Sequence, residues 1–153
     1  ELLGLYFGDE DQHFDHNTSQ DHVAPDTGSD LLYKGALDDR AQSAFRGIIR
    51  VHRDAQRTDA YQTNRNLLLS DECRANSLPN LEIEADDVRC SHGATVGQLD
   101  SEALFYLLSR GLSRDQAERL IVLGFLGDVL ARFPLGGVVK KVTRAIERKL
   151  EHV

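Results

Sequence analysis

The stretch "DLLYKGALDDRAQSAFRGIIRVH", residues 30–52, decides the fold of this chain, because it places two short apolar runs on either side of a polar turn. The runs, 30–37 and 44–52, are short and rich in the aliphatic and aromatic residues that favour strands. Similar runs, each bounded by Asp, Asn, Ser or Gly, occur at 2–8, 65–70 and 81–86. Residues 1–99 are therefore predicted to form short β-strands.

The spacing of these runs narrows the choice of architecture. Their centres lie roughly 14 to 20 residues apart, which is longer than simple two-residue hairpins require. Such spacing suits a parallel β-helix, in which each unit stacks on the one before it. A β-sandwich fits the same pattern, and the periodicity leaves both architectures open because no short repeat motif is visible.

The character of the chain changes near residue 100. Residues 1–99 carry 18 acidic and 9 basic residues, whereas residues 100–153 carry 7 acidic and 9 basic residues. Asp100 and Ser113 can cap the starts of two helices. Pro134 ends the second helix, and a basic amphipathic helix follows it. We expect a β-domain over 1–99 and a helical domain over 100–153, which packs on the strands or on another protein.

Composition excludes several classes of function. The net charge of −7 argues against general nucleic-acid binding, which needs a basic face to neutralise phosphates. No apolar run of about 18 residues is present, so no membrane span is expected. Two cysteines in 153 residues are too few for a disulfide-stapled secreted scaffold. We expect a cytoplasmic protein with free thiols.

Cys90 and His92, in "DDVRCSHGATVG" (86–97), are the first candidates for chemistry. Taken alone, the segment favours a turn after a strand, with glycines supplying backbone freedom. Cys73 lies 17 residues before Cys90, close to one step of the strand spacing. In a stacked ladder Cys73 could lie on the neighbouring rung. Two thiols and an imidazole would suit iron, copper or zinc, and the same arrangement would permit a disulfide.

Other polar residues have simpler interpretations. His13, Asp15, His16 and His22 include a His-x-x-His pattern, but the stretch is polar and we expect solvated loop histidines. Carboxylates near residues 82–87 are predicted to form a solvated strand edge. No phosphate-binding loop, nucleophile elbow or metalloprotease motif occurs, so no enzymatic activity is expected.

The segment "LFYLLSRGL" (104–112) is a candidate docking surface. Aromatic side chains and Arg are common anchors at protein interfaces. The residues either pack the helical tail on the strand body or contact a partner, and both interpretations stay open. The candidate docking residues are Leu104, Phe105, Tyr106, Arg110 and Gly111.

Three segments, 24–37, 44–70 and above all 81–126, resemble the SufB/SufD family of iron–sulfur cluster assembly scaffold proteins, most closely the C-terminal portion of its SufD members. The resemblance fades after about Phe133, and the full-length family proteins are much longer. It implies a right-handed parallel β-helix followed by a C-terminal helical domain. It therefore favours the β-helix over the sandwich.

The resemblance also implies a role in a SufBCD-type complex. It implies that a SufC-type ATPase docks on the helical domain and that a SufB-like subunit, or a second copy of this chain, pairs through the β-helix. Nascent clusters are expected at that interface, where His92 matches the family's SufD histidine and Cys90 the cysteine beside it. Cys73 departs from the SufD pattern and looks more like the SufB segment that carries its cluster cysteine.

These implications leave two functional hypotheses and one outside alternative. His92 and the thiols bind iron or a nascent cluster transiently, with no stably bound cofactor, or the chain is a purely structural interaction module. A polysaccharide-binding β-helix fits poorly, because aromatic residues make up only 7% of the chain and Trp is absent.

Overall fold

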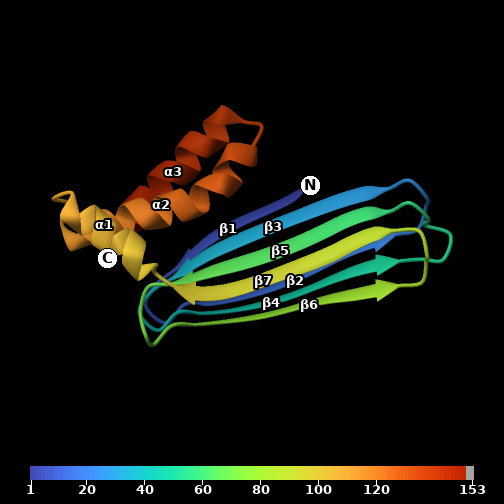
Figure 1. Cartoon of the computed structure of the whole chain (residues 1–153), viewed down its shortest axis with the longest axis horizontal. Coiled ribbons are helices and arrows are strands. Elements are labelled where there is room, and N and C mark those ends of the chain that lie inside the picture. Colours follow the sequence, from blue (N-terminus) through green and yellow to red (C-terminus); the bar gives the residue numbers. More distant parts are fainter. Residues whose placement is uncertain (151–153) are drawn as a thin grey trace.

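The computed structural model describes residues 1–150, and within them seven strands precede three helices (Figure 1). The strands are β1 (Leu2–Gly8), β2 (His13–His22), β3 (Gly28–Leu37), β4 (Gln42–Val51), β5 (Asp59–Leu68), β6 (Arg74–Ile83) and β7 (Arg89–Gln98). The helices are α1 (Ser101–Ser109), α2 (Arg114–Arg132) and α3 (Gly136–Leu150).

The strands form a parallel β-helix with two sheets. Odd-numbered strands form a sheet in the order β1-β3-β5-β7, and even-numbered strands form a second sheet in the order β2-β4-β6. Gly28 pairs with Asp59, and Asp59 pairs in turn with Arg89, which gives offsets of 31 and 30 residues between stacked strands. Each coil therefore contains two strands, one in each sheet.

The predicted parallel β-helix with C-terminal helices is confirmed, but the predicted stacking of successive strands is wrong. Successive strands alternate between the two sheets, so the strand that stacks on a given strand lies two strands along the chain. Two strands were also missed. β2 was expected to be a loop and β7 a turn, because neither has the apolar alternation by which a half-buried strand is recognised.

Ion pairs on the outer surface connect equivalent positions of neighbouring coils. Asp26 contacts Arg57 at 2.6 Å, and Asp11 contacts Arg40 at 2.7 Å. These acids belong to one coil and the bases to the next, which explains how an acidic chain can stack on itself. Because the pairs are exposed to water, each contributes little to stability. Most of the stability therefore comes from the buried interior.

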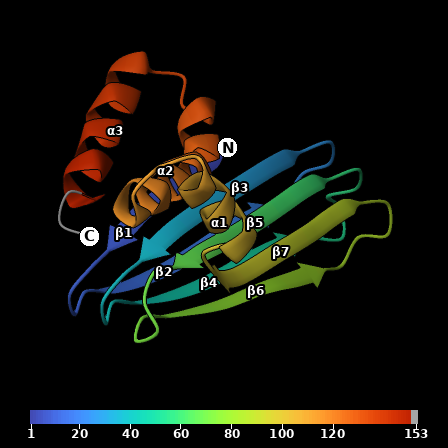
Figure 2. The same cartoon turned by 60° about the vertical axis from the view of Figure 1, so that its left-hand side comes forward.

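Helix α2 lies on the outer face of the odd-numbered sheet at β1 and β3, and α3 packs beside α2 (Figure 2). Asp100 caps α1, and Ser113 forms the predicted capping box with Gln116 at the start of α2. The helices share a hydrophobic core with the sheet, built from Ala36, Leu67, Val122, Leu126, Leu130, Ile146 and Leu150. Strands end at Gln98 and helices begin at Ser101, whereas the division into two domains stays a prediction. None of the described helices is long and apolar enough to cross a membrane.

Candidate functional site

His92 and Cys90 lie on β7, an outer strand of the odd-numbered sheet, and not in a turn as expected. Cys90 is in register with Ala60 and His92 with Gln62. Gln62 is 1% exposed and its side-chain amide donates to the carbonyl oxygen of Asn80 in the opposite sheet at 3.1 Å. Since register partners in a parallel sheet share a face, Cys90 and His92 lie on the inner face of β7.

The inner face of β7 is open to solvent at this end of the coil stack. Among the described strands, β7 pairs only with β5, and β6 only with β4. His92 is consequently exposed although its register partner Gln62 is buried. Ile83 and Val96, from the two outer strands, are 40% and 44% exposed. The last coil therefore presents an exposed imidazole on an unpaired strand edge, together with exposed apolar side chains elsewhere on its two strands.

Cys90 is half-buried beside His92. It packs against a small apolar cluster that includes Ala60 and Val88. Burial raises the pKa of the Cys90 thiol, so the group is protonated at neutral pH. A metal ion would have to displace that proton, because the thiolate is the ligand form. Cys90 and His92 lie on one face of β7 two residues apart, so they could offer a metal two neighbouring ligands.

Cys73 does not join them, and the expectation that it lies on the rung next to Cys90 is wrong. Consecutive strands run in opposite directions in the two sheets (Figure 1). Cys73 immediately precedes β6, whereas Cys90 is near the start of β7. The ten residues of β6 separate them by about 30 Å at 3.3 Å per residue.

The surroundings of Cys73 are those of a core residue. Its thiol is buried and donates to the carbonyl oxygens of Leu37 and Ser70, both at 3.2 Å. It packs with Tyr6, Leu37 and Ala41. Both cysteines are free, and no cluster of three His, Cys, Asp or Glu side chains suited to a metal occurs within residues 1–150.

Two of the three histidines of β2, His16 and His22, point into the interior, and all three lie on a strand, which corrects the loop prediction. His22 is 5% exposed, and its ring nitrogens lie 2.7 Å from the Thr27 hydroxyl and 2.8 Å from the Ser29 hydroxyl. His16 packs between the rings of Tyr6 and Tyr33, with centroids at 4.6 and 5.5 Å. Desolvation by burial lowers the pKa of both imidazoles. They stabilise the fold as neutral groups.

A buried column of polar side chains was not anticipated from the sequence. Gln20, Gln62, Asn64 and Asn66 are all at most 4% exposed. Gly47 makes room for Gln62, since a Cβ at residue 47 would lie 2.2 Å from the Gln62 side-chain oxygen. Polar residues alternate along 59–68, and this alternation was the signal in the sequence for the buried polar side chains. It was not recognised because the polar residues of an alternating strand are normally expected to face outward.

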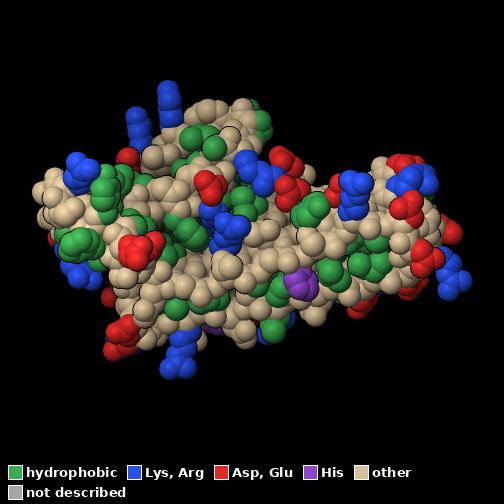
Figure 3. All heavy atoms as spheres, viewed as in Figure 1, with side chains coloured by type: hydrophobic (Ala, Val, Ile, Leu, Met, Phe, Trp, Pro, Cys, Tyr) green, Lys and Arg blue, Asp and Glu red, His purple; other side chains and the backbone are tan. Residues whose placement is uncertain are grey.

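The residues predicted for docking lie on or next to α1. Phe105 and Tyr106 are 73% and 55% exposed, and the Arg110 guanidinium lies 5.0 Å from the Tyr106 ring centroid. Gly111 ends the helix with φ of +91°. Leu104 is half-buried and lines a cleft of about 470 Å³ between α1 and the strand ends. Hydrophobic side chains are visible on the surface at the α1 end of the molecule (Figure 3).

A β-helix with an unpaired strand edge and a helix with exposed aromatic side chains define a class of protein with two surfaces suited to contacts with other chains. Residues 1–125 match the family described as "SUF system FeS cluster assembly, SufBD core domain". The chain belongs to the SufBD family of the SUF iron–sulfur cluster assembly system.

Individual relatives support the assignment. The chain is 42% identical over 158 aligned residues to an iron–sulfur cluster assembly SufBD family protein of Mycobacterium leprae, covering 98% of this chain and 40% of that protein. It is 40% identical to the iron–sulfur cluster assembly protein SufD of Bacillus subtilis, over 79% of this chain and 28% of that protein. It is 37% identical to SufD of Escherichia coli, over 89% of this chain and 32% of that protein. The chain thus spans less than half the length of these relatives.

Proposed function

We propose that this chain is a non-enzymatic part of an iron–sulfur cluster assembly scaffold. It pairs through the outer strands β6 and β7 with a SufB-like subunit or a second copy of itself, and it binds a SufC-type ATPase through α1. The observation that carries the proposal is the position of His92, which is exposed on an unpaired strand edge and on the inner face of the β-helix.

The strand edges support the pairing. An outer strand presents unpaired N–H and C=O groups, which readily bind a strand of another chain. Ile83 and Val96 add exposed apolar surface at the same end. A partner strand placed there would cover His92 and remove it from water. The imidazole would then lie inside an interface, as a ligand site shared between two chains requires.

Iron and sulfide are the cargo in this proposal. His92 and Cys90 supply two ligands from this chain, and the partner supplies the others. Imidazole in place of thiolate raises the reduction potential of an iron–sulfur cluster. A site that supplies only some of the ligands releases its cargo more easily than a complete site. Cys73 has no part in this site because β6 separates it from Cys90.

The decisive experiment changes His92 and reads cluster assembly and subunit pairing separately. The His92→Ala variant is co-expressed with its SufB-type partner and ATPase, purified under nitrogen, and reconstituted with iron and sulfide. We expect at least a tenfold lower yield of bound iron with the same subunit stoichiometry. Ser91→Ala is the matched control, because Ser91 is also exposed but occupies the opposite face of β7.

Two other outcomes lead to different conclusions. If His92→Ala loses the partner subunit, the residue is architectural and the chain is a structural interaction module. If the variant assembles clusters like the wild type, His92 is not a ligand and the proposed site is wrong.

A further inference from the structure

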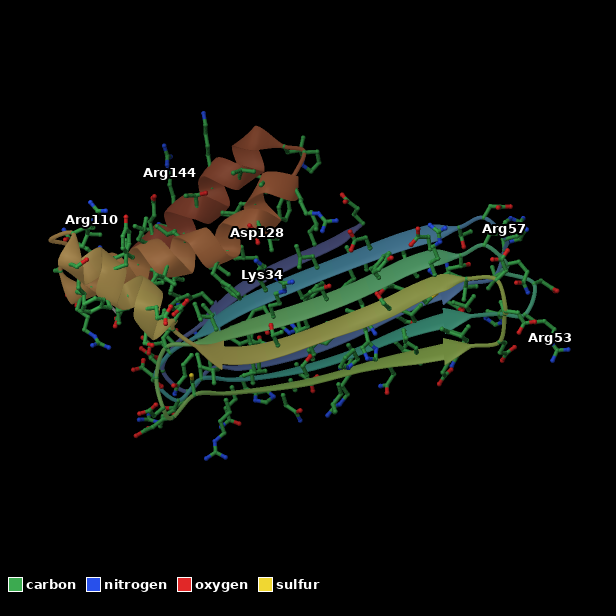
Figure 4. All side chains as sticks on the ribbon, viewed as in Figure 1. Lys34, Arg53, Arg57, Arg110, Asp128 and Arg144 are labelled. Atoms are coloured by element: carbon green, nitrogen blue, oxygen red, sulfur yellow. The ribbon has the colours of Figure 1, made fainter. Side chains whose placement is uncertain are left out.

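Lys34 is a buried cation on the outer face of β3, under helix α2 (Figure 4). Its side chain is 3% exposed. The ammonium donates to the backbone oxygen of Phe125 at 2.8 Å and to the Asp128 carboxylate at 2.6 Å. It also lies 4.7 Å from the centroid of the Phe125 ring. A buried ammonium is tolerated only when such partners are in place.

A second ion pair connects the same two elements with the opposite polarity. Arg132, one helical turn after Asp128 on α2, donates to Asp30, which lies four residues before Lys34 on β3. In chain order, the strand supplies Asp30 and then Lys34, and the helix supplies Asp128 and then Arg132. Because the helix runs antiparallel to the strand, each acid faces a base of the other element. The two pairs are therefore crossed, with one charge of each sign on each element.

The apolar contacts of α2 define its position along β3 only in part. The buried residues Val122, Leu126 and Leu130 recur every four residues. Sliding the helix by one turn, about 6 Å at 1.5 Å per residue, would bring two of them into the places of their neighbours. An apolar contact is lost only at one end of the row, where Glu118 would take the place of Val122 or the helix would end before the place of Leu130.

The charges do not tolerate the same slide. Moving α2 one turn in one direction carries Asp128 away from Lys34 and toward Asp30. Moving it one turn in the other direction carries Arg132 toward Lys34. Either shift brings like charges closer together and leaves Lys34 buried without its carboxylate, and specificity through repulsion of the alternative is well established in protein pairing. Arg65, in register with Lys34 on β5, would add to the repulsion of a displaced Arg132.

We propose that the crossed pairs Lys34–Asp128 and Asp30–Arg132 fix the register of α2 on β3, with Lys34 as the positioning residue. The helices and the odd-numbered sheet then move as one rigid body. Because that sheet continues from β3 through β5 to β7, a displacement of the helices is carried to the strand that holds His92. This last consequence rests on the proposed function, whereas the register itself does not.

The test exchanges the charge order without changing composition. One variant carries Asp128→Arg and Arg132→Asp on α2, and a second carries Asp30→Lys and Lys34→Asp on β3. A third combines all four substitutions. Amide hydrogen exchange of α2 is measured by mass spectrometry on the chain alone. We expect each two-residue variant to lose at least about tenfold in α2 protection. The combined variant should regain at least about threefold over either of them, without reaching wild type, because it lacks the contacts of the Lys34 ammonium with Phe125.

The matched control is Glu147→Lys on the exposed side of α3, which should leave α2 protection unchanged. If the four residues stabilise α2 independently of one another, α2 will be less protected in the combined variant than in either two-residue variant. That result would overturn the proposal. Wild-type protection in either two-residue variant would overturn it as well.

Titration with the SufC-type ATPase is measured separately. If the combined variant recovers α2 protection but neither it nor the wild type binds the ATPase, the proposed function is contradicted. The register proposal would then still hold.

Discussion

At the scale of single residues, the position of a polar side chain in the coil determines its role. His92 and His22 both lie on the inner faces of outer strands, but His22 is 5% exposed and hydrogen-bonded to the hydroxyls of Thr27 and Ser29, whereas His92 is exposed. The first is a structural group and the second is available for binding. The same residue type therefore serves two purposes, according to what covers it.

The buried histidines predict a pH dependence of stability. Burial lowers the folded-state pKa of His22 and of His16 below the unfolded value of about 6.5. Their contribution to folding is then fully present above pH 6.5 and is lost as the pH falls through the lower folded pKa. Urea unfolding at pH 7.5 and pH 5.5 should show lower stability at pH 5.5. The difference should shrink in His22→Gln and persist in His13→Gln, since His13 is exposed; an unchanged difference in His22→Gln would refute this role.

At the scale of elements, α1 differs from the other helices because no residue of it is buried. Its half-buried side, including Leu104, borders the cleft, and its outer side carries Phe105, Tyr106 and Arg110. A nine-residue helix is too short to be stable alone in water. Its exposed aromatic residues suit a docking surface better than internal packing.

Docking through α1 predicts the effect of a single charge. Phe105→Asp should weaken binding of the SufC-type ATPase at least tenfold by isothermal titration, because a buried aromatic anchor typically contributes 2 kcal/mol or about 30-fold. Leu135→Asp is the control, since Leu135 is 63% exposed in the same helical part of the chain but lies far from α1 in the sequence. Equal loss in both variants would show a general charge effect and argue against a specific surface on α1.

At the scale of the whole molecule, stacking of coils produces the fold. Phe45, Ile49 and Val51 of the central coil are at most 1% exposed, whereas the ion pairs between coils lie on the outside. The interior should therefore determine stability, and the outer charges should mainly favour the correct register of the coils.

This difference is measurable by mutation. Ile49→Ala should lower the free energy of unfolding by about 2–5 kcal/mol, because it leaves a cavity between two coils. Asp11→Ala should lower it far less, because its pair with Arg40 is exposed to solvent. Chemical denaturation with both variants tests the order. A larger loss for Asp11→Ala would mean that the outer ion pairs stabilise the stack.

The sequence by itself determined the strand-rich body, the helical tail with its caps, and the family of the chain. Those features depend on local signals: short β-rich runs, Asp100 and Ser113 as caps, and specific motifs around His92. Only the tertiary structure decided which residues meet. Polar residues of β2 and β5 face inward, where other strands contact them, as the hydrogen bonds from Gln20 to Ser29 and from Gln62 to Asn80 show, and no local pattern reveals these contacts. The same holds for the separation of Cys73 from Cys90 and for the crossed ion pairs between β3 and α2. Both depend on how segments far apart in the chain are arranged in space, which the spacing of residues along the sequence cannot specify.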